Sequence, residues 1–131
     1  MLLLNVSAGT ATQTSQQLNT PMAAGLLLRA KVTAGAVLLL TLAVDMWLDD
    51  SAEWIEYCKA GAALSGVSNA SYLPSPALGA APPLVPVGAV GADMTGSFCL
   101  PVPDLWRVRM IHGNATASTY TVTATVIGRR G

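Results

Sequence analysis

Charged residues are missing from two long stretches of this chain, and that feature restricts its possible folds more than any other. Residues 1–28 and 60–92 contain no Asp, Glu, Lys or Arg. Charged residues make up 11% of the whole chain, against roughly 25% in typical soluble proteins, and hydrophobic residues make up 52%. Uncharged stretches of this length suggest a membrane segment, a disordered segment or a surface that is buried against another protein.

A membrane-spanning segment is not expected. The longest uncharged apolar run between charges, residues 32–44, is shorter than the roughly 20 residues that a spanning helix needs. Leucines 2–4 follow no Lys or Arg, and Asn5 ends the run, so these residues resemble neither a secretion signal nor an anchor. The stretch 60–92 is too apolar for a solvated disordered linker. Protein contact is the explanation that remains.

Enzymatic and nucleic-acid-binding functions are also not expected. Seven basic and seven acidic residues cancel, so no basic field favours nucleic acid. His112 is the only histidine, and the chain has no GxSxG elbow, HExxH, CxxC or glycine-rich phosphate loop. We therefore predict that the protein is not an enzyme and binds no cofactor.

The acidic residues between positions 45 and 56 are the one candidate for a cation site. They lack the glycine and the alternate-position ligands of a calcium loop, so we interpret them as a solvated turn and predict no metal. Two cysteines, Cys58 and Cys99, are too few for a disulfide scaffold, and we expect two small buried side chains. Whether they pair is left open.

Alternation of apolar and polar residues predicts strands over residues 25–33, 37–48, 53–59, 105–112 and 118–127. Ala34 and Gly35 would form a tight connection between the first two, and residues 49–51 a second turn. The last two strands would form an antiparallel hairpin around a loop at 113–116. The side chains expected to face the core are Leu26, Leu28, Ala30, Val32, Leu38, Leu40, Leu42, Val44, Met46, Trp106, Val108, Met110, Tyr120, Val122, Ala124 and Val126.

Two segments are candidates for contact with a partner. Prolines make regular strands improbable across most of residues 60–103, although short strands near 62–67 and 96–100 fit the pattern. Residues 73–91 are expected to form a long Pro/Ala-rich docking loop. Residues 1–19 form either strands, at 2–6 and 11–18, or an extended N-terminal arm. The predicted contact residues are Leu2, Leu3, Leu4, Leu18, Leu73, Leu78, Leu84, Val85 and Val87.

The tryptophans and arginines allow two readings. Trp54 and Trp106 alternate in phase with core positions, whereas Trp47 is out of phase and is the best candidate for an exposed aromatic contact, for example with a sugar ring. Arg107 and Arg109 on the outer side of a strand would either pair with a neighbouring subunit or keep the sheet face solvated.

The C-terminal block PDLWRVRMIHGNATASTYTVTATVIG resembles the ending of small tailed-bacteriophage head decoration proteins, also called capsid cement or minor capsid proteins. The matching parts are the strand at 105–109, the turn at 112–114 and the strand at 119–122, and residues 26–44 fit the same pattern. The resemblance covers about half of the chain. It implies a small β-sandwich on the virion capsid surface, made in the host cytoplasm, whose partner is the major capsid protein.

The sequence therefore predicts one all-β domain over residues 1–131, an antiparallel β-sandwich of which a jelly roll is one form. The expected function is a virion structural protein that binds the outer surface of the head shell and clamps adjacent major capsid proteins. The alternatives are a carbohydrate-binding, host-recognition module of a virion fibre that uses Trp47, and a tail or connector subunit. A homo-oligomer is expected, with a trimer as the first hypothesis, and neither nucleic acid nor membrane is expected as a partner.

Overall fold

The computed structural model describes residues 1–21, 23–60, 63–72 and 104–129, and every regular element in this part of the chain is a β-strand. All strand pairs are antiparallel, which confirms the predicted all-β antiparallel fold. The strands are β1 (Leu2–Gly9), β2 (Gln13–Thr14), β3 (Leu18–Asn19), β4 (Ala23–Leu48), β5 (Glu53–Lys59), β6 (Leu64–Tyr72), β7 (Leu105–His112) and β8 (Ser118–Arg129).

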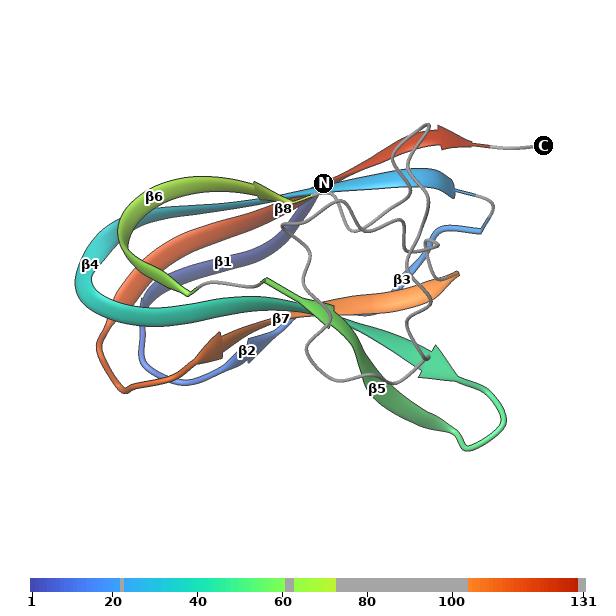
Figure 1. Ribbon diagram of the computed structural model, residues 1–131, viewed down its shortest axis with the longest axis horizontal. Helices are drawn as coiled ribbons and strands as arrows, with labels where there is room; N and C mark the ends of the chain where they lie inside the picture. Colours follow the sequence, from blue (N-terminus) through green and yellow to red (C-terminus); the bar gives the residue numbers. More distant parts are fainter. Residues whose placement is uncertain (22, 61–62, 73–103, 130–131) are drawn as a thin grey trace.

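The strands form one sheet that is folded over into two layers (Figure 1). One layer contains β1, β8, the first half of β4 and β6, and the other contains β2 and β3, β7, the second half of β4 and β5. Four stretches of the chain lie side by side in this sheet, and we call them ribbons. They are β1–β2–β3, β7–β8, β4 and β5–β6. Each ribbon passes from one layer to the other at the same end of the molecule.

β4 is a single strand of 26 residues, and this corrects the sequence-based expectation of two strands joined by a tight turn at Ala34 and Gly35. Its register against β8 shifts after Val32, and its register against β6 shifts on both sides of Ala36. Gly35 (φ 134°) and Val37 (φ 56°) have positive φ angles at this point. Bulges and left-handed residues bend a strand without ending its pairing, so β4 passes from the first layer into the second as one continuous strand.

The predicted hairpin of residues 105–112 and 118–127 is wrong in its pairing, although both strands are present. β7 pairs with the second half of β4, from Leu40↔His112 to Met46↔Trp106. β8 pairs with the first half of β4, from Ala23↔Arg129 to Ala34↔Thr119. Because β4 bends, its two partners lie in different layers, and the connection between β7 and β8 follows the same corner instead of closing a hairpin.

Side chains along each strand point alternately into the space between the two layers and out to solvent. The inward-pointing side chains form the core, as predicted. Large side chains that are less than 2% exposed include Trp106, Tyr120, Leu28 and Met110. Every residue expected to face inward from residues 26–32, 38–44, 106–110 and 120–124 is buried, while Met46 and Val126 are partly exposed. At roughly 1.5–3 kcal/mol for each large apolar side chain, this interior is the main source of stability.

The N-terminal residues belong to the sheet, so the structure supports the strand alternative and not the extended arm. β1 pairs with β8, and β2 and β3 pair with β7. Two small polar residues, Ser15 after β2 and Thr20 after β3, bond to the same neighbour: Ser15 Oγ accepts from the Val108 amide at 3.0 Å, and Thr20 Oγ1 accepts from Trp106 Nε1 at 2.7 Å. Hydroxyl groups therefore satisfy donors of β7 where the strand pairing is interrupted, which explains the Ser- and Thr-rich composition of this segment.

Candidate contact surface

One end of the molecule carries no charged side chain on any of its four crossing segments. We call this end the neutral corner and define it as residues 9–13, 33–39, 64–68 and 113–118, where the four ribbons pass between the layers (Figure 1). The register brings the segments together, since Gly9 pairs with Ser118, Ala34 with Thr119, and Ala36 with Gly66. None of these residues is Asp, Glu, Lys or Arg. Segments far apart in the sequence thus combine into a single uncharged surface.

The neutral corner also exposes apolar side chains. The large hydrophobic residues that are at least half exposed in the described part of the chain are Met1, Leu2, Val37, Leu39 and Val67. Val37 is 82% exposed, Val67 71% and Leu39 50%, and all three belong to the neutral corner. Isolated exposed apolar residues are ordinary, but three of them on adjoining uncharged segments form a surface that is inexpensive to dehydrate.

Val37 is held in a backbone conformation that β-branched residues rarely adopt. Its φ of 56° lies in the left-handed region, where an L-residue is destabilised by about 1–2 kcal/mol. The Asn114 side chain donates from Nδ2 to the Val37 carbonyl at 3.0 Å, and the Gly113 amide donates to the Leu39 carbonyl at 2.7 Å. The β7–β8 connection therefore fixes the strained segment and keeps the Val37 side chain pointing into solvent.

A histidine–tyrosine pair lies at the start of the neutral corner. His112 Nε2 and the Tyr120 hydroxyl are 2.8 Å apart, and the Tyr120 side chain is fully buried. Burial raises the pKa of Tyr120 to about 12 and lowers the pKa of His112 below its ordinary value. His112 Nδ1 is buried without a hydrogen-bond partner. Both groups are therefore neutral near pH 7 and add no charge to the neutral corner.

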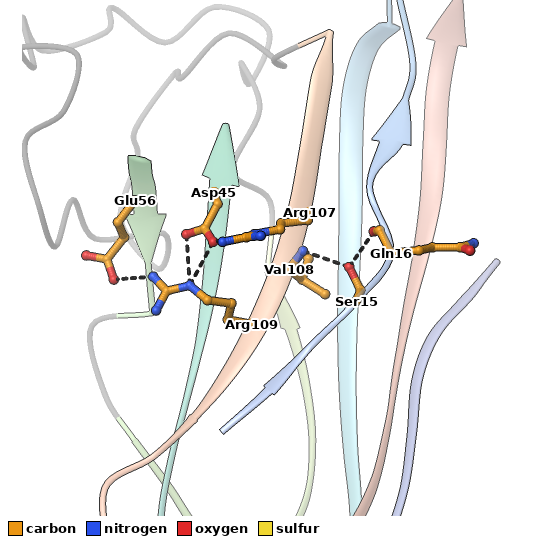
Figure 2. Close-up of polar contacts among 7 residues, drawn as sticks. All are labelled: Ser15, Gln16, Asp45, Glu56, Arg107, Val108 and Arg109. Carbon is orange, nitrogen blue, oxygen red and sulfur yellow. Dashed lines mark hydrogen bonds and ion pairs between the residues drawn. The ribbon is translucent and has the colours of Figure 1, made fainter. Parts of the chain in front are cut away.

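Four charged side chains form a cluster on the outer face of the second layer (Figure 2), while Arg29 and Lys31 are exposed on the first half of β4 in the first layer. The carboxylate of Asp45, 2% exposed, accepts from Arg107 Nε at 2.9 Å and from Arg109 Nε at 2.8 and 2.9 Å. Arg109 Nη2 also donates to Glu56 Oε1 at 3.0 Å. The two arginines are thus paired with carboxylates of the same chain, an arrangement that neither sequence-based alternative included.

The prediction that Trp54 packs in the core is wrong, because Trp54 belongs to the same outer cluster as the arginines. The guanidinium of Arg107 lies 4.5 Å from the centre of the Trp54 ring, and Trp54 meets Trp47 edge-on with centroids 5.4 Å apart. Trp54 is therefore on the outer face, because β5 packs Tyr57 and not Trp54 against the core. Trp106 is buried as expected, and Trp47 is out of phase with the core but only partly exposed.

The predicted contact residues divide into three groups. Leu3, Leu4 and Leu18 are at most 9% exposed and pack in the core of this chain, which corrects their assignment as contact residues. Two consecutive leucines can both face inward because the register of β1 shifts between Leu2 and Leu4. Leu2 is 54% exposed and stays a candidate. The remaining candidates, Leu73, Leu78, Leu84, Val85 and Val87, lie outside the described residues, as do Cys99 and the predicted loop at 73–91.

Sequence reasoning missed Val37, Leu39 and Val67 as candidate contact residues. Alternation puts Leu39 on the opposite side of its strand from Leu38 and Leu40, but no local feature of the sequence shows that its neighbours there are uncharged. Only the pairing of β4 with β6 and the proximity of the β7–β8 connection reveal the shared surface. The signal in the sequence was the absence of charged residues from 1–28 and 60–92. It identifies a surface only once the bend of β4 is known.

No metal site and no membrane-spanning helix were found in the described segments. These segments contain no group of three His, Cys, Asp or Glu side chains that could hold a metal ion. They also contain no helix with the length and hydropathy required to cross a bilayer. No family model matches the chain, and comparisons with curated proteins and with solved structures gave no match.

Proposed function

We propose that the protein is a virion head decoration protein that binds the outer surface of the shell through its neutral corner and clamps adjacent major capsid proteins. The observation that supports this proposal is the uncharged end that carries the exposed side chains of Val37, Leu39 and Val67. The resemblance of residues 105–122 to small phage head proteins suggests the kind of partner.

Physical reasoning favours an attachment surface of this kind. Clamping requires contact with more than one neighbour, and the neutral corner is assembled from four segments that span both layers (Figure 1). Burying uncharged groups avoids the desolvation penalty of several kcal/mol that an unpaired ion would incur. Away from the neutral corner, the ion pairs of Asp45, Arg107, Arg109 and Glu56 are satisfied within the chain, and the exposed Asp49, Asp50 and Glu53 keep the free surface soluble.

Rebinding to heads stripped of this protein tests the proposal. The wild-type chain should rebind and raise the melting temperature of the heads. Val67→Asp places a charge in the neutral corner at an exposed position and should weaken rebinding at least tenfold without unfolding the protein. Ala52→Asp is the matched control, because it adds the same charge to an exposed turn at the other end, where Asp also tolerates the positive φ of 51°. Absence of wild-type rebinding, or equal effects of the two variants, would contradict the proposal.

A carbohydrate-binding function is the second candidate, supported by the adjoining and partly exposed rings of Trp47 and Trp54. Aromatic faces can stack on sugar rings, and the partly exposed guanidinium of Arg107, 4.5 Å from the centre of the Trp54 ring, offers hydrogen-bond donors beside them. A glycan array should then give specific binding that Trp47→Ala removes. An array without specific binding, or binding that survives the substitution, would exclude this function.

A further inference from the structure

Charge is divided unequally between the two layers of the sheet. The strands of the first layer, β1, β6, β8 and the first half of β4, contain Arg29, Lys31 and Arg129 and no acidic residue. The second layer, taken with the β4–β5 turn and residue 104, contains six acidic and three basic residues. They are Asp45, Asp49, Asp50, Glu53, Glu56 and Asp104, and Lys59, Arg107 and Arg109. One layer therefore has an excess of three positive charges and the other an excess of three negative charges.

Two cations of the first layer lie on an outer face that has no acidic residue. Arg29 and Lys31 are both exposed, and their side chains leave the same side of β4 about 7 Å apart along the strand. Neither of them belongs to an ion pair within the described residues. We call this surface the basic face and define it by these two cations and their uncharged cross-strand neighbours. The neighbours are Thr121 and Thr123 on β8 and Asn69 and Ser71 on β6.

The second layer ends in a turn that is acidic and aromatic. Asp49, Asp50 and Glu53 are exposed where β4 turns into β5, and no ion pair of the described residues includes them. The adjoining pair of the ladder, Trp47↔Trp54, places two partly exposed rings beside these carboxylates. We call residues 47–54 the acidic tip. Carboxylates and aromatic rings both attract cations, so this end of the molecule fits a positively charged surface.

A single molecule cannot bring its acidic tip to its own basic face. The tip lies at the end of β4 in the second layer, whereas the basic face looks outward from the first layer, and the core separates the two (Figure 1). The whole chain has no net charge, so two copies do not repel each other at long range. An unrelated acidic partner would match only the basic face, whereas a second copy matches the basic face and the acidic tip together.

We infer that copies of this chain associate through the acidic tip of one copy and the basic face of the next. The tip carboxylates pair with Arg29 and Lys31 across the contact. The ring of Trp47 adds a cation–π contact of the kind that Arg107 makes with Trp54 within the chain, at 4.5 Å. Exposed ion pairs are individually weak, so the association requires a high protein concentration.

The two surfaces in this contact are different, so it repeats from copy to copy. Such a contact forms a ring where the rotation closes and a filament where it does not. The trimer expected from the sequence is one ring of this kind. The inference rests on the charges and exposure of the chain itself and does not depend on the proposed function.

Removal of the two cations tests the contact by sedimentation velocity. At about 500 µM protein and about 20 mM salt the wild-type chain should form oligomers, whose dissociation constant should rise about fivefold or more at about 500 mM salt. Arg29→Gln combined with Lys31→Gln should raise the dissociation constant about tenfold or more. Gln16→Glu combined with Gln17→Glu is the matched control, because it lowers the net charge equally at exposed positions between β2 and β3. This control should leave the association unchanged.

Exchange of charge between the two surfaces is the sharper test. Arg29→Glu combined with Lys31→Glu makes the basic face acidic, and Asp49→Lys combined with Asp50→Lys makes the acidic tip basic. Each variant alone then has two surfaces of like charge and should be monomeric, whereas an equimolar mixture should associate again. All four positions are exposed, so both variants should fold, which circular dichroism checks.

Three results would overturn the inference. One is a wild-type chain that stays monomeric at low salt and high concentration. Another is an association that resists salt, or that the Gln16 and Gln17 control weakens as much as loss of the two cations does, since both would place the contact elsewhere. The third is a mixture of the charge-exchanged variants that stays monomeric although both are folded. Rebinding to stripped heads at low occupancy, where bound copies do not meet, is a separate measurement, so failure of either proposal leaves the other intact.

Discussion

Among single residues, Val37 combines a strained backbone with a side chain that contributes little to the fold. Its φ is 56° and its side chain is 82% exposed, so replacement by glycine relieves strain and loses almost no packing. Glycine increases the entropy of the unfolded chain, which offsets part of this gain. We expect Val37→Gly to raise the free energy of unfolding by about 0.5–1 kcal/mol, measured by urea denaturation.

The control for this substitution is Val67→Gly. Val67 is similarly exposed, but its φ is not positive, so glycine there should lower the free energy of unfolding by about 0.5–1 kcal/mol. Loss of stability in both variants would show that Val37 is not strained. If Val37→Gly is more stable yet rebinds heads less well, the strain is retained for contact, as is common at functional sites.

His112 should make stability depend on pH. Burial lowers its pKa in the folded protein below the ordinary value of 6.5, so the unfolded chain takes up a proton at a higher pH than the folded chain does. Stability is therefore fully present above pH 6.5 and decreases as the pH falls below it. The melting temperature should fall between pH 7 and pH 5, and it should fall less for His112→Gln. Equal slopes for the two proteins would contradict this assignment.

Asp45 is the residue whose charge should matter most for stability. It is buried and neutralises both Arg107 and Arg109, so Asp45→Asn leaves two guanidinium groups without their shared carboxylate. Removing one partner of a buried ion pair costs about 3–5 kcal/mol, and the partial exposure of the arginines reduces this to about 2–3 kcal/mol. Asp50→Asn in the exposed turn should change the unfolding free energy by less than about 0.5 kcal/mol. Similar urea midpoints for both variants would contradict the prediction.

On the scale of whole elements, the bend of β4 is the feature on which the fold depends, and Gly35 is its most restrictive position. Its φ is 134°, and an added Cβ would lie 2.8 Å from Leu38 Cδ1 and 3.2 Å from the Ala117 carbonyl oxygen. Gly35→Ala should therefore lower the unfolding free energy by about 1–3 kcal/mol. Gly66→Ala, on the paired strand, would meet only the Gly35 carbonyl oxygen at 3.8 Å and should be tolerated. Equal melting temperatures for the two variants would show that the bend does not need glycine.

The same element explains which parts of the fold could be predicted from the sequence. Alternation located β5 and β7 at the residues observed and identified the buried faces of β4 and β8, because period-two burial is a local property. Pairing was predicted wrongly at Ala34–Gly35 and at residues 113–116, whereas the turn predicted at residues 49–51 does join the paired strands β4 and β5. Gly35 does mark a change of direction, but the chain turns between layers while remaining paired to β6 and β8, and that depends on distant strands.

The contact surface could be predicted only in part, for the same reason. Absence of charge over residues 1–28 and 60–92 did indicate a neutral surface, but residues 33–39 and 113–118 contribute as much to it. The apolar residues chosen in the first stretch were the wrong ones, since Leu3, Leu4 and Leu18 are needed in the core. Hydrophobicity alone cannot separate a core residue from a contact residue, whereas strand register can.

For the molecule as a whole, the absence of charged residues from the neutral corner predicts how attachment should respond to salt. The neutral corner has no Asp, Glu, Lys or Arg, and the ion pairs of Asp45, Arg107, Arg109 and Glu56 lie on the outer face of the second layer. Salt at 0.1 M screens exposed charges beyond about 10 Å, and at 1 M beyond about 3 Å. Contact through the neutral corner should therefore have a dissociation constant that changes less than about threefold over this range.

Attachment through the charged face would behave differently, because its ion pairs with the shell would weaken as salt rises. Titration of stripped heads with labelled protein at several salt concentrations distinguishes the two orientations, and Val67→Asp provides an internal reference, since it adds one charge to the corner. Tenfold or greater weakening of the wild-type chain by salt would place the contact on the charged face. If the affinity of the wild-type chain does not change with salt and the affinity of Val67→Asp is reduced, the neutral corner faces the shell. The reason is that the new charge at residue 67 must be desolvated on binding only if the neutral corner is the contact.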